Sequence, residues 1–352
     1  AVVAANDHLN FVGRFAESSA NWPSSGVRFN IVSLNTTSTV MVNINNCVDD
    51  CKIYVDAIVD CVVVQNMEVS AATPYVSLQL STVIGETYEI FLKKVTEASN
   101  GDARGNFDVG DVLLDGAEFN SKSVGAIAPK HHNCLHRHKM LVIGDSITAA
   151  YGVDGTSPCS FTAATENSDH SYATIVASAV QAELHIVAWS GKGVVRNYGD
   201  ANQMSETPMP DYYNRTIATT PVSSSVADPN YWDPVRFPAD IVLVMLGTND
   251  YSTQPAPSDA QFTTGLVDFL ARVITDYPAA KGRIGAMCAP LAAGPQCANI
   301  QQAAQQAGVN YVFIDPDTLS GGYGCDYHPN AVTQQNIANV VAPAVKNWLQ
   351  EQ

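Results

Sequence analysis

The sequence predicts a chain of two parts, an all-β sandwich of jelly-roll type in residues 1–120 and an α/β domain with a five-stranded parallel sheet in residues 139–352. Two observations predict this division. The first part consists of short runs in which apolar and polar residues alternate, separated by Gly, Asn and Ser turns. In the second part, continuous apolar runs alternate with segments of helical length, as in a doubly wound sheet.

The β half is predicted from strands that have one apolar face. In residues 39–45 the side chains of Val40, Val42 and Ile44 fall on the same face, because successive side chains of a strand point to opposite sides. The same alternation, or a run rich in β-forming residues, occurs at 26–34, 52–64, 76–81, 88–93 and 106–114. Many short strands of this kind indicate a sandwich or jelly roll.

Residues 121–138 connect the two parts and are interpreted as a linker, since they contain Pro129 and show no periodicity. Potential metal ligands crowd into a short stretch of it, namely His131, His132, Cys134, His136 and His138. Such crowding is poor geometry for a closed tetrahedral metal site. A solvated connector is therefore the favoured interpretation, with Cys134 in a disulfide and no metal bound.

Five buried strands are expected in the α/β half, each from a short apolar run. The candidates 139–144, 184–189, 240–246, 283–288 and 309–314 alternate with helices expected at roughly 171–183, 258–276, 298–307 and 331–350. The helix at 258–276 opens on Ser258, a residue type common at N-caps, and stops before Pro278. In sheets of this kind the ligand site lies outside the carboxyl ends of the strands.

Charge and composition exclude several function classes. The chain of 352 residues is 46% hydrophobic and carries a formal charge of −16, which supports full cores but disfavours binding to nucleic acid or anionic membranes. No apolar run approaches membrane-spanning length.

The first residue is Ala1, the eight cysteines are even in number, and Asn35 and Asn214 begin N-glycosylation sequons. Together these clues favour a secreted eukaryotic protein over a bacterial export protein.

Polar residues suited to acyl transfer follow three of the predicted strands and precede the last helix. Gly-Asp-Ser146 follows the first strand, Ser-Gly191 the second and Gly-Thr-Asn249 the third, while Asp326-Tyr-His328 lies before the final helix. A serine nucleophile, a histidine base and independent N–H donors are what ester hydrolysis requires. Taken singly, each residue also has a structural interpretation, as a helix cap or a turn residue. The four blocks together favour the catalytic interpretation.

These four ordered blocks resemble those of the SGNH (GDSL) hydrolase superfamily. The chain also resembles carbohydrate esterase family two, in which a β-sandwich of jelly-roll type precedes an SGNH domain. Val12-Gly13-Arg14-Phe15 and residues 94–98 carry this likeness in the β half, and residues 191–198 and 246–251 carry it in the second half. The resemblance implies that 139–352 is an α/β SGNH hydrolase domain.

The resemblance further implies a secreted serine O-acetyl esterase that removes acetyl groups from plant cell-wall polysaccharide, such as acetylated xylan or glucomannan. Ser146 would form the acetyl-enzyme with His328 as the base. The N–H groups of Ser146 and Gly191 and the amide of Asn249 would form the oxyanion hole. No metal or organic cofactor is implied. The expected partner is an acetylated polysaccharide or oligosaccharide, bound by a monomer.

The third member of the catalytic triad is the open point. Most SGNH enzymes place the acid three residues before the histidine, where this chain has Cys325, whereas Asp326 lies two before His328. In family two a backbone carbonyl can replace the carboxylate. We predict that the Asp326 carboxylate holds the ring of His328, with a backbone carbonyl as the alternative.

The cysteines and the aromatic residues near the blocks give further expectations. Cys288 and Cys297 flank a loop of eight residues and are the predicted disulfide. One pair is expected among Cys47, Cys51 and Cys61, whose connectivity stays open. Candidates for a sugar-binding surface are Trp189, Tyr251, Trp232 and Tyr327, with burial in the core as an equally supported alternative.

Other functions remain as alternatives at this point. One is another SGNH esterase, either a pectin-type acetylesterase or a short-chain lipase, although no amphipathic insertion suited to a lid is present. Another is a carbohydrate-binding protein with an inert hydrolase domain, against which the intact Ser146, Asn249 and His328 argue. A third is that residues 1–120 form a glycan-binding module.

Overall fold

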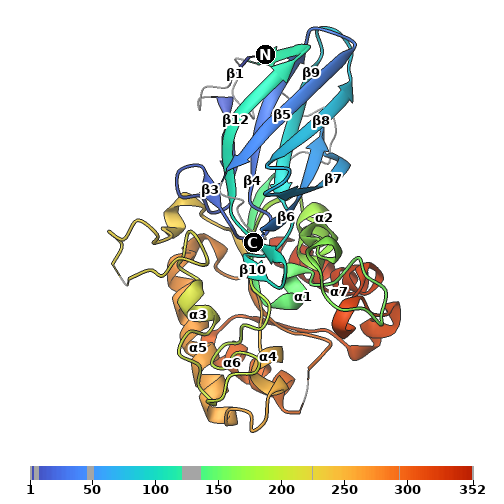
Figure 1. The fold of residues 1–352 in the computed structure, drawn as a ribbon. Helices are drawn as coiled ribbons and strands as arrows, with labels where there is room; N and C mark the ends of the chain where they lie inside the picture. Colours follow the sequence, from blue (N-terminus) through green and yellow to red (C-terminus); the bar gives the residue numbers. More distant parts are fainter. Residues whose placement is uncertain are drawn as a thin grey trace. The chain divides into compact units, whose positions relative to one another are not determined.

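The structure is a computed structural model that describes residues 2–3, 8–45, 51–120, 136–223, 225–292 and 294–350. The described residues divide into two compact units, here called unit 1 and unit 2 (Figure 1). Unit 1 is drawn from residues 1–135 and also includes Thr162–Ala164, and unit 2 is drawn from 136–161 and 165–352. His131, His132 and Cys134 of the expected linker lie outside the described residues. No described helix is both long enough and apolar enough to cross a bilayer.

Unit 1 is built from two β-sheets whose inner faces share one apolar core. The first sheet contains β1 (Val2–Val3), β3 (Ser19–Ala20), β5 (Thr37–Asn45), β8 (Tyr75–Ser81) and β12 (Phe107–Asp115). The second contains β2 (Asn10–Val12), β4 (Gly26–Ser33), β6 (Lys52–Val59), β7 (Val62–Ser70), β9 (Thr87–Lys94), β10 (Ser99–Asn100), β11 (Ala103–Arg104) and β13 (Ala117–Phe119). Apart from a short parallel pairing of β11 with β6, the strands pair antiparallel.

The core of unit 1 follows the alternation in the sequence. Val40, Val42 and Ile44 of β5 are buried and pack with residues of the second sheet, such as Val27 and Ile90. Burial of one face of each sheet explains why these strands pair in a fixed register. The predicted all-β sandwich is therefore confirmed, as an antiparallel β-rich domain.

One predicted run of unit 1, residues 52–64, proves to be two strands. Asp60 and Cys61 have φ values of 47° and 67° and form the turn between β6 and β7. Two consecutive left-handed residues match the twist of a tight β-hairpin, so the chain reverses there instead of continuing as one strand.

Unit 2 contains the predicted five-stranded parallel sheet. Its strands are β14 (His138–Gly144), β15 (Ala182–Ala188), β16 (Ile241–Met245), β17 (Ile284–Cys288) and β18 (Asn310–Phe313), in the order β15-β14-β16-β17-β18. The chain leaves β14 toward one edge of the sheet and later returns to β16 on the other side. The crevice between β14 and β16, at their carboxyl ends, is therefore the switch point where such folds bind ligands.

Helices of unit 2, labelled in Figure 1, contact the strands of this sheet. They are α1 (Ser146–Ala149), α2 (Tyr172–Ala179), α3 (Met209–Tyr212), α4 (Thr248–Ser252), α5 (Asp259–Asp276), α6 (Gln296–Ala307) and α7 (Ala331–Gln350). The helices α2 and α7 pack on each other. They share an apolar core with the sheet, to which α2 contributes Val176, β14 contributes Val142 and α7 contributes Ile337. The helix expected at 171–183 is shorter than predicted, since Gln181 adopts a left-handed φ of 56° and ends it.

Candidate active site

The candidate nucleophile Ser146 is placed by the end of β14 and the start of α1. Asp145 is the N-cap of α1, and its carboxylate accepts a hydrogen bond of 3.0 Å from the Ile147 N–H. The side-chain amide of Gln334 in α7 donates to the Ile147 carbonyl at 2.9 Å and so ties the short helix to α7. Ser146 is the first residue of α1, where a backbone N–H has no acceptor within the helix. The hydroxyl and the backbone N–H of Ser146 therefore both lie at the carboxyl end of β14.

His328 reaches this serine from the segment before α7. Its Nε2 atom lies 2.9 Å from the Ser146 Oγ, although 182 positions separate the two residues in the chain. Its Nδ1 atom lies 3.1 Å from the backbone carbonyl oxygen of Asp326. A carbonyl can only accept, so Nδ1 carries the proton and Nε2 is left as the acceptor that a general base needs. Burial lowers the pKa of His328, which favours this neutral form.

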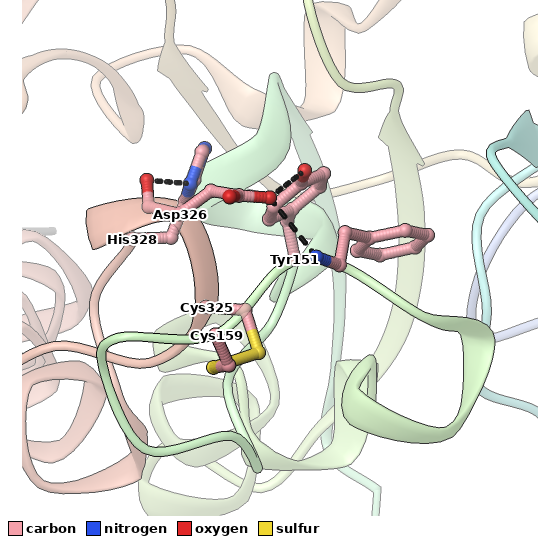
Figure 2. Close-up of a disulfide and its surroundings, with 6 residues drawn as sticks. Tyr151, Cys159, Cys325, Asp326 and His328 are labelled. Atoms are coloured by element: carbon pink, nitrogen blue, oxygen red, sulfur yellow. Dashed lines mark hydrogen bonds between the residues drawn. A yellow bond between two sulfur atoms is a disulfide. The ribbon is translucent and has the colours of Figure 1, made fainter.

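The Asp326 carboxylate does not hold the imidazole, contrary to the sequence-based expectation. Its Oδ2 atom accepts hydrogen bonds from the Tyr151 hydroxyl at 2.7 Å and from the Phe161 N–H at 3.0 Å, as Figure 2 shows for Tyr151. Asp326 has a left-handed backbone with φ 48° and ψ 37°. This conformation directs the carbonyl of Asp326, rather than its carboxylate, toward His328.

The candidate oxyanion donors lie at the ends of the two strands beside β14. Gly191 follows β15 and has a φ of 78°, a conformation that favours glycine. Asn249 lies in α4, directly after β16, and is buried. Its Nδ2 atom donates to the Lys192 carbonyl at 2.9 Å and lies 3.3 Å from the Asp145 Oδ2. The residues predicted from three separate blocks are thus linked by hydrogen bonds at one sheet edge.

Asp250 fixes the loop that follows Gly191, a role that the sequence did not reveal. Its buried carboxylate accepts hydrogen bonds from three consecutive backbone N–H groups, those of Val194 at 2.9 Å and of Val195 and Arg196 at 2.8 Å. Burial raises its pKa to about 6, even though these bonds favour the charged form. A polar residue next to Asn249 at a strand end was the available signal for such a role.

The four aromatic residues named as substrate contacts do not share one environment. Trp232 and Tyr251 are 3% and 6% exposed, so they belong to the core, because large apolar rings gain most from burial. Tyr327, which precedes His328, is 68% exposed. Trp189 is half-buried and packs edge-on against Tyr212 with ring centroids 4.9 Å apart. Of the four candidates, only Tyr327 and Trp189 have solvent-exposed side-chain surface that a sugar could contact.

Two disulfides join described cysteines of unit 2. The expected pairing of Cys288 with Cys297 is present. The second disulfide joins Cys159 to Cys325 and was not predicted (Figure 2). Sequence carried no spacing signal for it, nor for the contacts of Tyr151, because the two segments meet only in the folded domain. Of the three cysteines expected to form a pair in the β half, Cys51 and Cys61 each take part in a disulfide, and Cys47 lies outside the described residues.

The two expected glycosylation sites differ in exposure. Asn35 is exposed in the turn between β4 and β5, where a glycan has room. Asn214 is half-buried after α3, and the next two residues of its sequon are buried. A glycan is therefore accommodated more readily at Asn35 than at Asn214.

Known proteins are similar to this chain in sequence and in architecture. The sequence model of the GDSL-like lipase/acylhydrolase family matches residues 142–335. The cellulase/esterase CelE of Acetivibrio thermocellus is 32% identical over 98% of this chain and 40% of its own length. An acetylxylan esterase / glucomannan deacetylase of Cellvibrio japonicus is 25% identical over 60% of this chain and 57% of its own length. The chain thus spans about half the length of these relatives.

A solved structure resembles the chain over nearly its whole length. It is a family two carbohydrate esterase from Clostridium thermocellum in complex with cellohexaose, 27% identical, with a TM-score of 0.77, covering 97% of this chain and 99% of that chain. The family match covers more than half of this chain and includes Ser146, Gly191, Asn249 and His328. The chain therefore belongs to the GDSL-like lipase/acylhydrolase family.

Proposed function

We propose that this protein is a secreted serine esterase that removes O-acetyl groups from plant cell-wall polysaccharide, such as acetylated xylan or glucomannan. The observation that carries the proposal is the 2.9 Å contact between His328 Nε2 and Ser146 Oγ at the switch point of the sheet. A hydroxyl hydrogen-bonded to an imidazole whose other nitrogen is occupied by an acceptor is the arrangement of an activated serine nucleophile.

In the proposed reaction, Ser146 Oγ attacks the carbonyl carbon of the acetyl ester while His328 Nε2 takes the hydroxyl proton. The imidazolium then gives this proton to the sugar oxygen as the C–O bond breaks, leaving an acetyl-enzyme on Ser146. Water, deprotonated by the same imidazole, hydrolyses the acetyl-enzyme and releases acetate. The Asp326 carbonyl keeps the proton on Nδ1 throughout, so the ring stays in the productive tautomer.

Three donors are proposed to hold the negative charge of the tetrahedral intermediate. They are the N–H groups of Ser146 and Gly191 and the side-chain amide of Asn249. One amide hydrogen of Asn249 is held by the Lys192 carbonyl at 2.9 Å. The other amide hydrogen is donated to Asp145 Oδ2 at 3.3 Å, the longer of the two hydrogen bonds, and it is the one proposed to turn to the oxyanion.

Carbohydrate as the substrate class is supported by the relatives and by the surface beside the site. The names of the matched proteins include acetylxylan esterase, glucomannan deacetylase and a cellohexaose complex. Tyr327 is exposed directly before His328, and its ring lies 6.1 Å from that of Tyr323, which is also exposed. Exposed aromatic rings suit the apolar faces of sugar rings.

The proposal is tested by acetate release from acetylated xylan, acetylated glucomannan, acetylated pectin and an aryl acetate. We expect release from the first two polymers to exceed release from pectin. Ser146→Ala should lower kcat by about 10⁴–10⁶ and leave the circular dichroism unchanged. Substantial turnover by Ser146→Ala would refute the mechanism, and a preference for pectin would refute the substrate class. Detection of the protein in culture medium of its source cells tests secretion.

A further inference from the structure

The carbonyl that orients His328 lies in an unusual stretch of backbone. Asp326 and Tyr327 are consecutive residues with φ values of 48° and 59°, in the left-handed region. Residues other than glycine occupy this region only when surrounding contacts hold them there. The position of the Asp326 carbonyl, and with it the orientation of the imidazole, therefore depends on those contacts.

Asp326 is held through both its backbone and its side chain. Its backbone N–H donates to the Cys159 carbonyl at 2.8 Å, and the neighbouring Cys325 is joined to Cys159 by a disulfide. Its carboxylate Oδ2 accepts from the Tyr151 hydroxyl and the Phe161 N–H (Figure 2). The hydrogen bond from Tyr151 is the main cause that lowers the pKa of Asp326, and the exposure of the side chain to solvent also favours the ionised carboxylate. An exposed carboxylate that is fixed in this way serves as an anchor.

Tyr151 also contacts the imidazole directly. Its ring centroid lies 4.2 Å from that of His328, with an interplanar angle of 34°, and 4.2 Å from that of Phe161, with an angle of 26°. Its backbone N–H donates to the Ser146 carbonyl at 3.0 Å. The same residue thus touches the backbone of the nucleophile, the ring of the base and the carboxylate of Asp326.

We propose that Tyr151 is a positioning residue that anchors the Asp326 carboxylate, so that the Asp326 carbonyl holds His328 in place while the carboxylate charge stays near the imidazole. The proposal rests on the ester hydrolysis proposed above. The groups that face His328 are the Ser146 hydroxyl, the Tyr151 ring, and Asp326 and Cys325 of its own segment. Of these, the Asp326 carboxylate carries the charge, and it favours the imidazolium.

The chemistry of Asp326 allows geometry and charge to be separated. A single oxygen, Oδ2, accepts both side-chain hydrogen bonds. The amide oxygen of Asp326→Asn can accept the same two bonds, so this variant keeps the anchor and removes the charge. Asp326→Ala removes both, and Tyr151→Phe keeps the ring against His328 and removes only the hydroxyl.

The test measures kcat and KM on an aryl acetate for these three variants and for the double variant Tyr151→Phe/Asp326→Ala. We expect Tyr151→Phe and Asp326→Ala each to lower kcat by about 10- to 100-fold with KM unchanged, because a small displacement of the base has effects of this size. The double variant should lose no more than Asp326→Ala alone, since the hydroxyl acts through that carboxylate. Asp326→Asn keeps the anchor and should therefore lose less kcat than Asp326→Ala. Tyr75→Phe, on the exposed face of β8, is the control and should change nothing.

A second measurement reads the imidazole without catalysis. In an NMR titration, with the His328 signal assigned by its loss in His328→Gln, Asp326→Asn should lower the pKa of His328. If wild type releases no acetate yet this shift occurs, the proposed function fails while the role of the carboxylate charge stands. The inference is overturned if Tyr151→Phe keeps the wild-type kcat or changes KM alone. It is also overturned if the double variant loses further kcat beyond Asp326→Ala, or if the His328 pKa does not shift in Asp326→Asn.

Discussion

The disulfide between Cys159 and Cys325 should stabilise the fold and hold the catalytic segment, and a second disulfide provides a matched control. In the chain-entropy description, a disulfide removes conformational freedom from the unfolded chain in proportion to the logarithm of the loop that it closes. The Cys159–Cys325 loop spans 166 positions, and the Cys288–Cys297 loop spans 9. These lengths correspond to about 5 and about 2.5 kcal/mol of stabilisation, a difference of about 2.5 kcal/mol.

The perturbation is replacement of each pair by alanine, as Cys159→Ala/Cys325→Ala and Cys288→Ala/Cys297→Ala. Urea unfolding should show the larger loss of unfolding free energy for the first pair. In addition, the first pair should lower kcat on an aryl acetate by about tenfold at a temperature where both variants are folded, because Cys325 precedes the residue whose carbonyl holds His328. The control pair should retain kcat. Equal stability losses, or a wild-type kcat in the first variant, would refute this reasoning.

Three further outcomes are expected. Asn249→Ala should lower kcat by about 10²–10³ with KM little changed, since its amide acts on the oxyanion, and an effect on KM alone in steady-state kinetics would contradict this. Burial lowers the pKa of His328 below the ordinary 6.5, so kcat/KM should fall with decreasing pH only below that value, as the imidazole becomes protonated; an acid limb above it would contradict the assignment. Burial raises the pKa of Asp250 from 3.8 to about 6, so its contribution to stability is full below about pH 4 and is lost as the pH rises through about 6. The free energy of unfolding should therefore fall by about 3 kcal/mol across this range, as measured by urea unfolding. Asp250→Asn should abolish this decline.

The β half and the parallel sheet could be predicted because their signals are local. Alternation in residues 39–45 and the continuous apolar run before Ser146 each report which faces of a strand are buried. Errors arose where a single backbone conformation decided the outcome. The left-handed residues Asp60 and Cys61 divide one predicted run into two strands, and Gln181 ends a helix early. Neither sequence position carries the glycine that would have signalled such a turn.

The candidate site was predictable only as a set of strand ends. Parallel strands bring their carboxyl ends to one edge, so Ser146, Gly191 and Asn249 were expected to meet there. Trp232 and Tyr251 show the limit of that argument. Their place in the chain does not reveal whether a ring faces the core or the solvent, and the structure buries both.

By itself, the sequence determined the two-part architecture, which follows from periodicity, and the catalytic blocks, which follow from residue types in a fixed order and from their resemblance to a known family. Only the tertiary structure decided what orients His328. Spacing in the sequence brings both the carboxylate and the carbonyl of Asp326 within reach of the ring, and the choice depends on one backbone rotation. That rotation is held by Tyr151, Phe161 and Cys159, which lie more than 160 positions away and are brought to Asp326 by folding.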